Sequence, residues 1–223
     1  MRYKGVIDSL NLSSNEIEAH FVGGDYSIVP VKSIGVFNND LWFDEFGVNL
    51  TRNIIEAKII YTSTGIVLPL KRYSRSQDKQ VLEFAGLHSY TEKSMFLKEL
   101  LRGLKERLQD EVITRVDVAI DFKEKIPERV IREMRKKRKP FSYKNSNYFK
   151  TKSEGKKNYN TNIVIYPKHI KEGFSDEVQR LEFSFGSQYF KRDFRLYNLE
   201  SAVVKMSRTI KRFCGLEVEI LPV

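Results

Sequence analysis

The sequence lacks the features of several common protein classes. Its only cysteine, Cys214, excludes an internal disulfide bond and a cysteine-based zinc cluster. It contains no run of about 18 apolar residues, which a membrane-spanning helix would need, and residues 1–10 lack the apolar region of a signal peptide. We therefore expect a soluble cytoplasmic protein that does not act on a membrane.

Acidic residues are fewer than basic residues. The 223 residues include 39 lysines and arginines but 29 aspartates and glutamates, which gives a net charge of +10. Such a balance favours a polyanionic partner, with nucleic acid first and an acidic membrane surface as the weaker alternative. The apolar fraction of 41% is ordinary for a folded protein, so the chain can bury a substantial core.

Residues 113–122 form the most informative segment, because they predict a strand with two different faces. Arg115, Asp117 and Asp121 share one face, and apolar side chains fill the other. Neighbouring carboxylates raise each other's pKa unless a cation offsets them, so this pair suggests a metal ion. The alternative is a solvated face on which the acids only pair with arginine.

Two other predicted strands repeat this pattern, at residues 80–86 and 178–185. They contain Glu83 and Glu182, each flanked by apolar residues that point the other way. If all the apolar faces pack on helices, the acids emerge together on the opposite face of one sheet. Oxygen ligands suit Mg²⁺ or Mn²⁺, the ions commonly used for phosphoryl transfer. We therefore predict a carboxylate metal site, in which the participation of Glu83 stays open.

These patterns predict an α+β fold, with a mainly antiparallel sheet, two or three helices on one face and an open charged face on the other. We expect helices near residues 91–108, 127–138 and 196–213, the last of which stops near Gly215. The strands that flank the first helix should be parallel neighbours or nearly so. We treat residues 1–223 as one domain, with a loosely patterned part at 1–53 and a core at 54–223.

Basic residues are concentrated after the two-faced strand. Between residues 123 and 144 there are ten lysines and arginines but three acids. This run is dense enough to contact a phosphate backbone, although a solvated helix face is an equally good interpretation. The predicted DNA contacts in it are Arg135, Lys136, Lys137, Arg138 and Lys139. Aromatic residues follow, including Phe141 and Tyr143, which could stack on bases or fill a core.

A nucleophile has few candidates in this sequence. No Gly-x-Ser-x-Gly segment occurs. Tyrosine can attack a phosphodiester when a metal ion neutralises the phosphate. Tyr148 and Tyr166 share the polar faces of their predicted strands with Lys150 and Lys168, respectively. The alternative for either tyrosine is a packed or hydrogen-bonded side chain.

Several segments resemble, in the same order, the plasmid rolling-circle replication initiators of the replication-initiation-factor class and related relaxases. These segments are VLEFAGLHSYTEKSMFLKELLRGLKERLQDEVITRVDVAIDF at 81–122, IVIYPK at 163–168 and VQRLEFSF at 178–185. They are similar to a strand ending in a Glu-Phe-x-Gly-like turn before a helix, an Arg-x-Asp-x-Ala-x-Asp strand, a Tyr-x-Lys strand and an Arg-x-Glu strand. The resemblance covers residues 80–186.

The resemblance implies an enzyme that nicks and rejoins the DNA of a plasmid or mobile element. In this family a tyrosine cuts one strand at the origin, keeps the 5′ phosphate and leaves a 3′ hydroxyl to prime synthesis. Carboxylates hold the divalent metal, whereas better-known relatives use a His-hydrophobic-His pair. The histidines of this chain form no such pair; they are His20, His88 and His169. The residue-by-residue correspondence makes Asp117, Asp121 and Glu182 metal ligands, and Arg115 and Arg180 phosphate or pairing candidates.

Family members usually carry the nucleophile in a Tyr-x-Gly-Ser-like strand, where this chain has Asn-Tyr-Phe-Lys-Thr at 147–151. Position makes Tyr148 the first candidate, and Tyr166 and Tyr159 are the alternatives.

In the implied mechanism, Mg²⁺ or Mn²⁺ polarises the scissile phosphate, while Lys150, Lys168 and the basic run hold the DNA backbone. The implied partner is origin DNA, either single-stranded or as a hairpin; host helicase or other replication machinery and a second copy of the chain stay open. Two rival functions remain, a non-catalytic DNA-binding module on the same scaffold and a metal nuclease that uses water.

Overall fold

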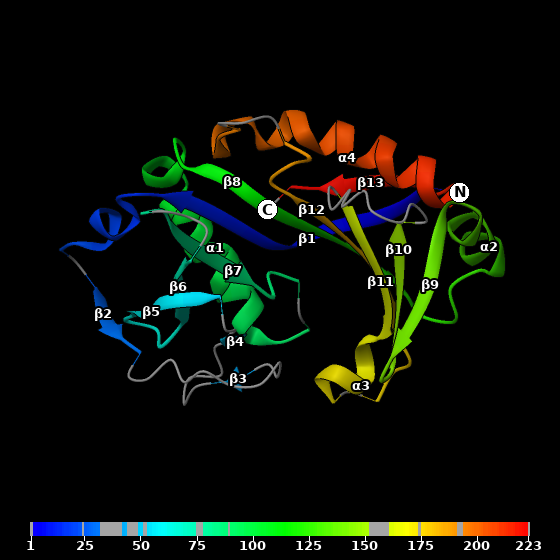
Figure 1. Ribbon diagram of the computed structural model, residues 1–223. Coiled ribbons are helices and arrows are strands. Elements are labelled where there is room, and N and C mark those ends of the chain that lie inside the picture. Colours follow the sequence, from blue (N-terminus) through cyan, green and yellow to red (C-terminus); the bar gives the residue numbers. More distant parts are fainter. Residues whose placement is uncertain are drawn as a thin grey trace.

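The computed structural model describes residues 2–23, 25–31, 42–43, 49–50, 53–74, 78–88, 90–151, 161–173, 175–190 and 194–222. Within these ranges, eleven strands form one large sheet, and the short strands β3 (Trp42–Phe43) and β4 (Asn49–Leu50) pair separately. The predicted α+β class, with a mainly antiparallel sheet, is confirmed (Figure 1).

Spatial order in the sheet differs strongly from sequence order. From one edge to the other, the strands are β2 (Tyr26–Pro30), β5 (Ile54–Thr62), β6 (Val67–Tyr73), β7 (Gln80–Ala85), β1 (Arg2–Ser14), β8 (Val112–Phe122), β12 (Gln179–Gly186), β11 (Thr161–Pro167), β10 (Ser146–Thr151) and β9 (Arg138–Tyr143). The last strand of the chain, β13 (Glu217–Leu221), runs parallel to β1.

The central position of β1 differs from the prediction. The loose pattern of residues 1–53 predicted only short strands and turns, yet β1 is 13 residues long and pairs with β8 along one edge. Its other edge pairs first with β13 and then with β7. Because β1 lies antiparallel to both β7 and β8, those two strands run parallel but are not neighbours.

The described helices are α1 (Glu92–Leu108), α2 (Glu128–Lys137), α3 (Lys168–Glu172) and α4 (Leu199–Cys214), with short 3₁₀ helices at Ile17–Phe21 and Leu196–Asn198. Of these, α1, α2 and α4 pack on the apolar side of the sheet. Leu104 of α1, Met134 of α2 and Met206 of α4 all join one core with the apolar residues of the strands. Figure 1 shows α4 lying along β8 and β13, with α1 beside β7.

The helix boundaries follow local sequence signals. The helix α4 ends before Gly215, whose φ of 73° is the left-handed conformation that glycine adopts most easily. Pro127 precedes α2, where its missing N–H group removes no helical hydrogen bond. None of the described helices combines the length and apolar character needed to cross a membrane.

Candidate functional site

Strand register brings the polar residues of four strands onto the face opposite α1, α2 and α4. Arg180 of β12 lies between Asp121 of β8 and Tyr166 of β11. In the next row, Glu182 lies beside Val164 of β11, which in turn lies beside Tyr148 of β10. Adjacent strands are about 4.8 Å apart, so Tyr148 and Glu182 are separated by about 10 Å across the sheet.

A cleft of about 580 Å³ opens on this face. Its lining includes Arg115, Tyr148, Tyr166, Lys171 and Glu182. The cleft thus combines two cations, a carboxylate and two of the three candidate tyrosines, which is a suitable composition for a phosphate-binding site.

The two tyrosines of the cleft differ in accessibility. The Tyr166 side chain is 7% exposed and its hydroxyl donates a 2.9 Å hydrogen bond to Oε2 of Glu182. Burial and the Glu182 charge raise the pKa of the Tyr166 hydroxyl, which makes it a poor nucleophile. Tyr148 is 37% exposed and can reach a substrate in the cleft. Tyr159 lies outside the described residues.

The surroundings of Glu182 disfavour the charged form of its carboxyl group. Burial raises the pKa of its carboxyl, and the carboxylates of Asp117 and Asp8 raise it further. Asp8 was absent from the predicted site, although it interrupts the apolar residues of β1 and is itself buried. It lies at an irregularity of the β1–β8 pairing, between Ile7 and Ser9.

Asp117 is buried and paired with a partly exposed arginine. Arg115 Nε donates to Oδ1 of Asp117 at 2.8 Å, and the Nη2–Oδ2 distance is also 2.8 Å. The nearby carboxylates of Asp117, Glu182 and Glu83 raise the pKa of Arg115. About half of the Arg115 side chain remains exposed in the cleft, so this arginine can hold Asp117 and still approach a phosphate.

Asp121 and Arg180 form a structural pair, which favours the pairing role over the DNA contact proposed for Arg180. Arg180 is completely buried, and its guanidinium also binds Asp8 at 3.0 Å and the His88 carbonyl oxygen at 2.8 Å. Hydrogen bonds from Arg180, His88 and Tyr90 hold the pKa of Asp121 well below its usual range. Arg180 is thus too deeply buried to contact DNA, and both oxygens of Asp121 are already bound by its guanidinium.

Glu83 is bound by two residues of β6. Its Oε2 lies 2.6 Å from Nζ of Lys71, and its Oε1 accepts a 3.1 Å hydrogen bond from Tyr73. Because a buried lysine neutralises it, the structure gives no support for a metal-binding role of Glu83.

The predicted ligand set is therefore only partly assembled. Within the described ranges, no three His, Cys, Asp or Glu side chains are arranged to hold a metal ion. The carboxylates that do influence one another are Asp8, Asp117 and Glu182. Three carboxylates of this kind supply the oxygen ligands that Mg²⁺ and Mn²⁺ prefer.

The exposed lysine that follows β11 is Lys171 and not the predicted Lys168. Lys168 is 3% exposed, begins α3 and pairs with Glu172, so it cannot contact DNA as predicted. Lys171 is exposed instead, with Nζ 5.0 Å from the centre of the Tyr166 ring, and it lines the cleft. The strand ends at Pro167, one residue before Lys168, which explains the difference.

The basic run at 135–139 lies mostly away from the cleft, because α2 packs on the helix side of the sheet. Arg138 is buried against the ring of Phe213, and burial lowers the pKa of its guanidinium. Lys136 pairs with Glu133, and Lys137 donates to the Arg212 carbonyl oxygen. Arg135 is exposed in a groove beside α2. Within this run, only Lys139 has the register of the open face, and its partner in the β9–β10 ladder is Lys150.

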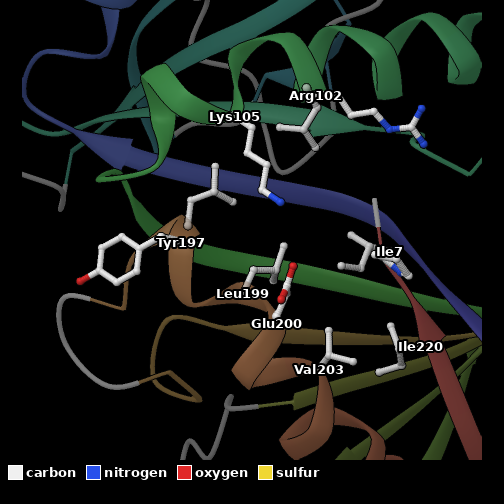
Figure 2. A pocket seen from close by; sticks show the side chains of 11 residues that line it. Ile7, Arg102, Lys105, Tyr197, Leu199, Glu200, Val203 and Ile220 are labelled. Atoms are coloured by element: carbon white, nitrogen blue, oxygen red, sulfur yellow. The ribbon is translucent and has the colours of Figure 1, made fainter.

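A second cavity, of about 300 Å³, lies on the helix side of the sheet between α1 and α4 (Figure 2). Ile7 and Ile220 form part of its lining, and Lys105 and Tyr197 lie at its border. Since the sheet separates this cavity from the acids, it takes no part in the candidate site.

No family model matches this chain, and no curated protein matches its sequence. Among solved structures, the chain is similar to one described as "Structure of Rolling Circle Replication Initiator Protein from Geobacillus stearothermophilus". The two share 16% sequence identity with a TM-score of 0.41, and the similarity covers 82% of this chain and 74% of the other.

Proposed function

We propose that this protein nicks and rejoins single-stranded DNA in rolling-circle replication, with Tyr148 as the nucleophile. The observation that supports this most is the cleft in which an accessible tyrosine, two cations and a buried carboxylate with a raised pKa lie together. An electropositive chain of net charge +10 suits a DNA substrate.

Each residue of the cleft has a role in the proposed reaction. Arg115 and Lys171 bind the scissile phosphate and offset its charge. Tyr148 attacks the phosphorus, forms a phosphotyrosine ester with the 5′ phosphate and releases the 3′ hydroxyl. Asp8, Asp117 and Glu182 would hold Mg²⁺ or Mn²⁺, which when bound polarises the phosphate oxygens.

The test is a covalent-capture assay. The protein is incubated with Mn²⁺ and a 3′-labelled pool of single-stranded oligonucleotides, because the enzyme keeps the 5′ phosphate of the labelled fragment. A denaturing gel should show a labelled protein–DNA adduct that is lost in Tyr148→Phe and kept in Tyr166→Phe. The reverse pattern would assign the nucleophile to Tyr166, and cleavage without an adduct would indicate a metal nuclease that uses water.

One observation favours a second candidate function. Arg115 already neutralises Asp117, and Arg180 already neutralises Asp121, as expected of a scaffold that needs no metal ion. A non-catalytic DNA-binding module would bind the oligonucleotides but give neither an adduct nor cleavage in the same assay. Contacts with a host helicase or a second copy of the chain stay predictions.

A further inference from the structure

The β9–β10 hairpin exposes aromatic rings on the same face as the cleft. Phe141 is 47% exposed and Tyr143 is 57% exposed. Phe141 lies directly opposite Tyr148 in the ladder, with ring centres 6.4 Å apart, and Tyr143 lies opposite Ser146. Phe141 therefore continues the row that leads from Glu182 to Tyr148. Since alternate residues of a strand share a face, Tyr143 lies on the same face, two residues further along β9.

This hairpin is also strongly basic. Residues 138–151 contain four lysines and arginines and no acid. Lys139 and Lys144 are exposed, and Nζ of Lys144 lies 5.6 Å from the centre of the Tyr143 ring. The exposed cation Lys171 also lines the cleft.

Exposed aromatic residues on an edge strand are unfavourable unless a partner covers them, because they invite aggregation. The charge of the hairpin selects the partner, since rings interleaved with cations suit a polyanion that has exposed planar groups. Unpaired nucleotides provide both, whereas the bases of a duplex are already stacked on one another.

We propose that Phe141 and Tyr143 form a stacking platform for the unpaired nucleotides next to the scissile phosphate. The position of that phosphate rests on the proposed function, but the platform itself does not require cleavage. Successive strands are about 4.8 Å apart, so Phe141 lies about 15 Å from Glu182 on the far side of Tyr148. The platform therefore receives nucleotides on one side of the cut only and recognises their single-stranded state.

The experiment measures binding without chemistry. Tyr148→Phe protein in EDTA is titrated into a fluorescein-labelled 20-nucleotide single strand and into the duplex of the same sequence, with anisotropy as the readout. The test variant adds F141A and Y143A. The matched control adds F96A and Y197A, which remove a phenylalanine and a tyrosine of similar exposure from α1 and from the helix-side cavity.

We expect F141A/Y143A to weaken single-strand binding at least tenfold, because each base–aromatic stack contributes roughly a tenfold factor or more. Duplex binding and the F96A/Y197A control should change less than threefold. In addition, F141W should keep the affinity, and its fluorescence should be quenched by the single strand.

Three results would overturn the platform: unchanged single-strand affinity of F141A/Y143A, an equal loss in F96A/Y197A, or an equal loss for the duplex. Failure of the nicking proposal is a separate result, since it would remove the covalent adduct but leave this binding difference intact. Circular dichroism of each variant confirms that the exposed substitutions leave the fold in place.

Discussion

Arg180 and Asp121 form a bidentate ion pair, with Nε of Arg180 2.6 Å from Oδ1 and Nη2 2.7 Å from Oδ2 of Asp121. Arg180 comes from β12 and Asp121 from β8, so this buried pair joins two central strands of the sheet. The same arginine reaches Asp8 of β1. These contacts of Arg180 hold the strands beside the site in place and contribute no reactive group to it.

We expect Asp121→Asn to be strongly destabilising. Removing one charge from a buried pair leaves the other uncompensated, which costs about 3 kcal/mol of the free energy of unfolding. Urea denaturation at pH 7 measures this loss. Ser201→Ala, an exposed change on α4, is the control. An Asp121→Asn protein as stable as the wild type would contradict the structural role.

The effect of Asp121→Asn should depend on pH. Arg180 lowers the folded-state pKa of Asp121 below its ordinary value of 3.8, so the unfolded chain binds protons more readily at this residue. The stabilisation is therefore complete above about pH 4 and is lost as the pH falls through the folded-state pKa. The difference in unfolding free energy between wild type and variant should shrink in acid, and a constant difference would refute this linkage.

Glu182 should show the opposite pH dependence. Burial and the neighbouring carboxylates raise its folded-state pKa above the ordinary 4.5, so the folded state binds the proton more tightly. The protonated carboxyl stabilises the folded state fully below pH 4.5, and this stabilisation is lost as the pH rises through the folded-state pKa. Glu182→Gln should consequently be more thermostable than the wild type at pH 8 without divalent ions, and Glu177→Gln, at an exposed position, should not.

If the carboxylates hold a metal ion, divalent ions should make the wild type more thermostable than Glu182→Gln. Mn²⁺ at about 100 times its dissociation constant stabilises a one-site protein by about 2.7 kcal/mol. The melting temperature of the wild type should rise with Mn²⁺, whereas Glu182→Gln should respond weakly. Equal shifts in both proteins would place the ion elsewhere, and no shift in the wild type would support the non-catalytic candidate.

Alternation along single strands predicted much of this arrangement. The two-faced pattern of residues 113–122 correctly assigns Val118 to the core and Asp117 to the opposite face, because strand geometry is local. The end of α4 at Gly215 was also predictable from one residue.

The partners of these residues were not predictable, because they depend on contacts between distant segments. Inserting β1 between β7 and β8 brings Asp8 to Arg180, which is 172 positions away in the sequence. Likewise, β11 ends one residue earlier than predicted. Lys168 is therefore buried against Glu172, and Lys171 is the lysine that lines the cleft.

These two lysines provide a sensitive test of the proposed DNA surface. Lys171→Ala removes an exposed cation from the cleft. The slope of log affinity for single-stranded DNA against log salt concentration should therefore become less negative by about 0.7, and the stability should not change. Lys168→Ala leaves the mostly buried Glu172 without its ion-pair partner, so it should cost about 3 kcal/mol of stability and keep the slope. Titrations at four salt concentrations, combined with urea denaturation of each variant, separate the two effects. If Lys168→Ala alone reduced the slope, the DNA would have to contact the buried side of α3, and the cleft would no longer be the binding surface.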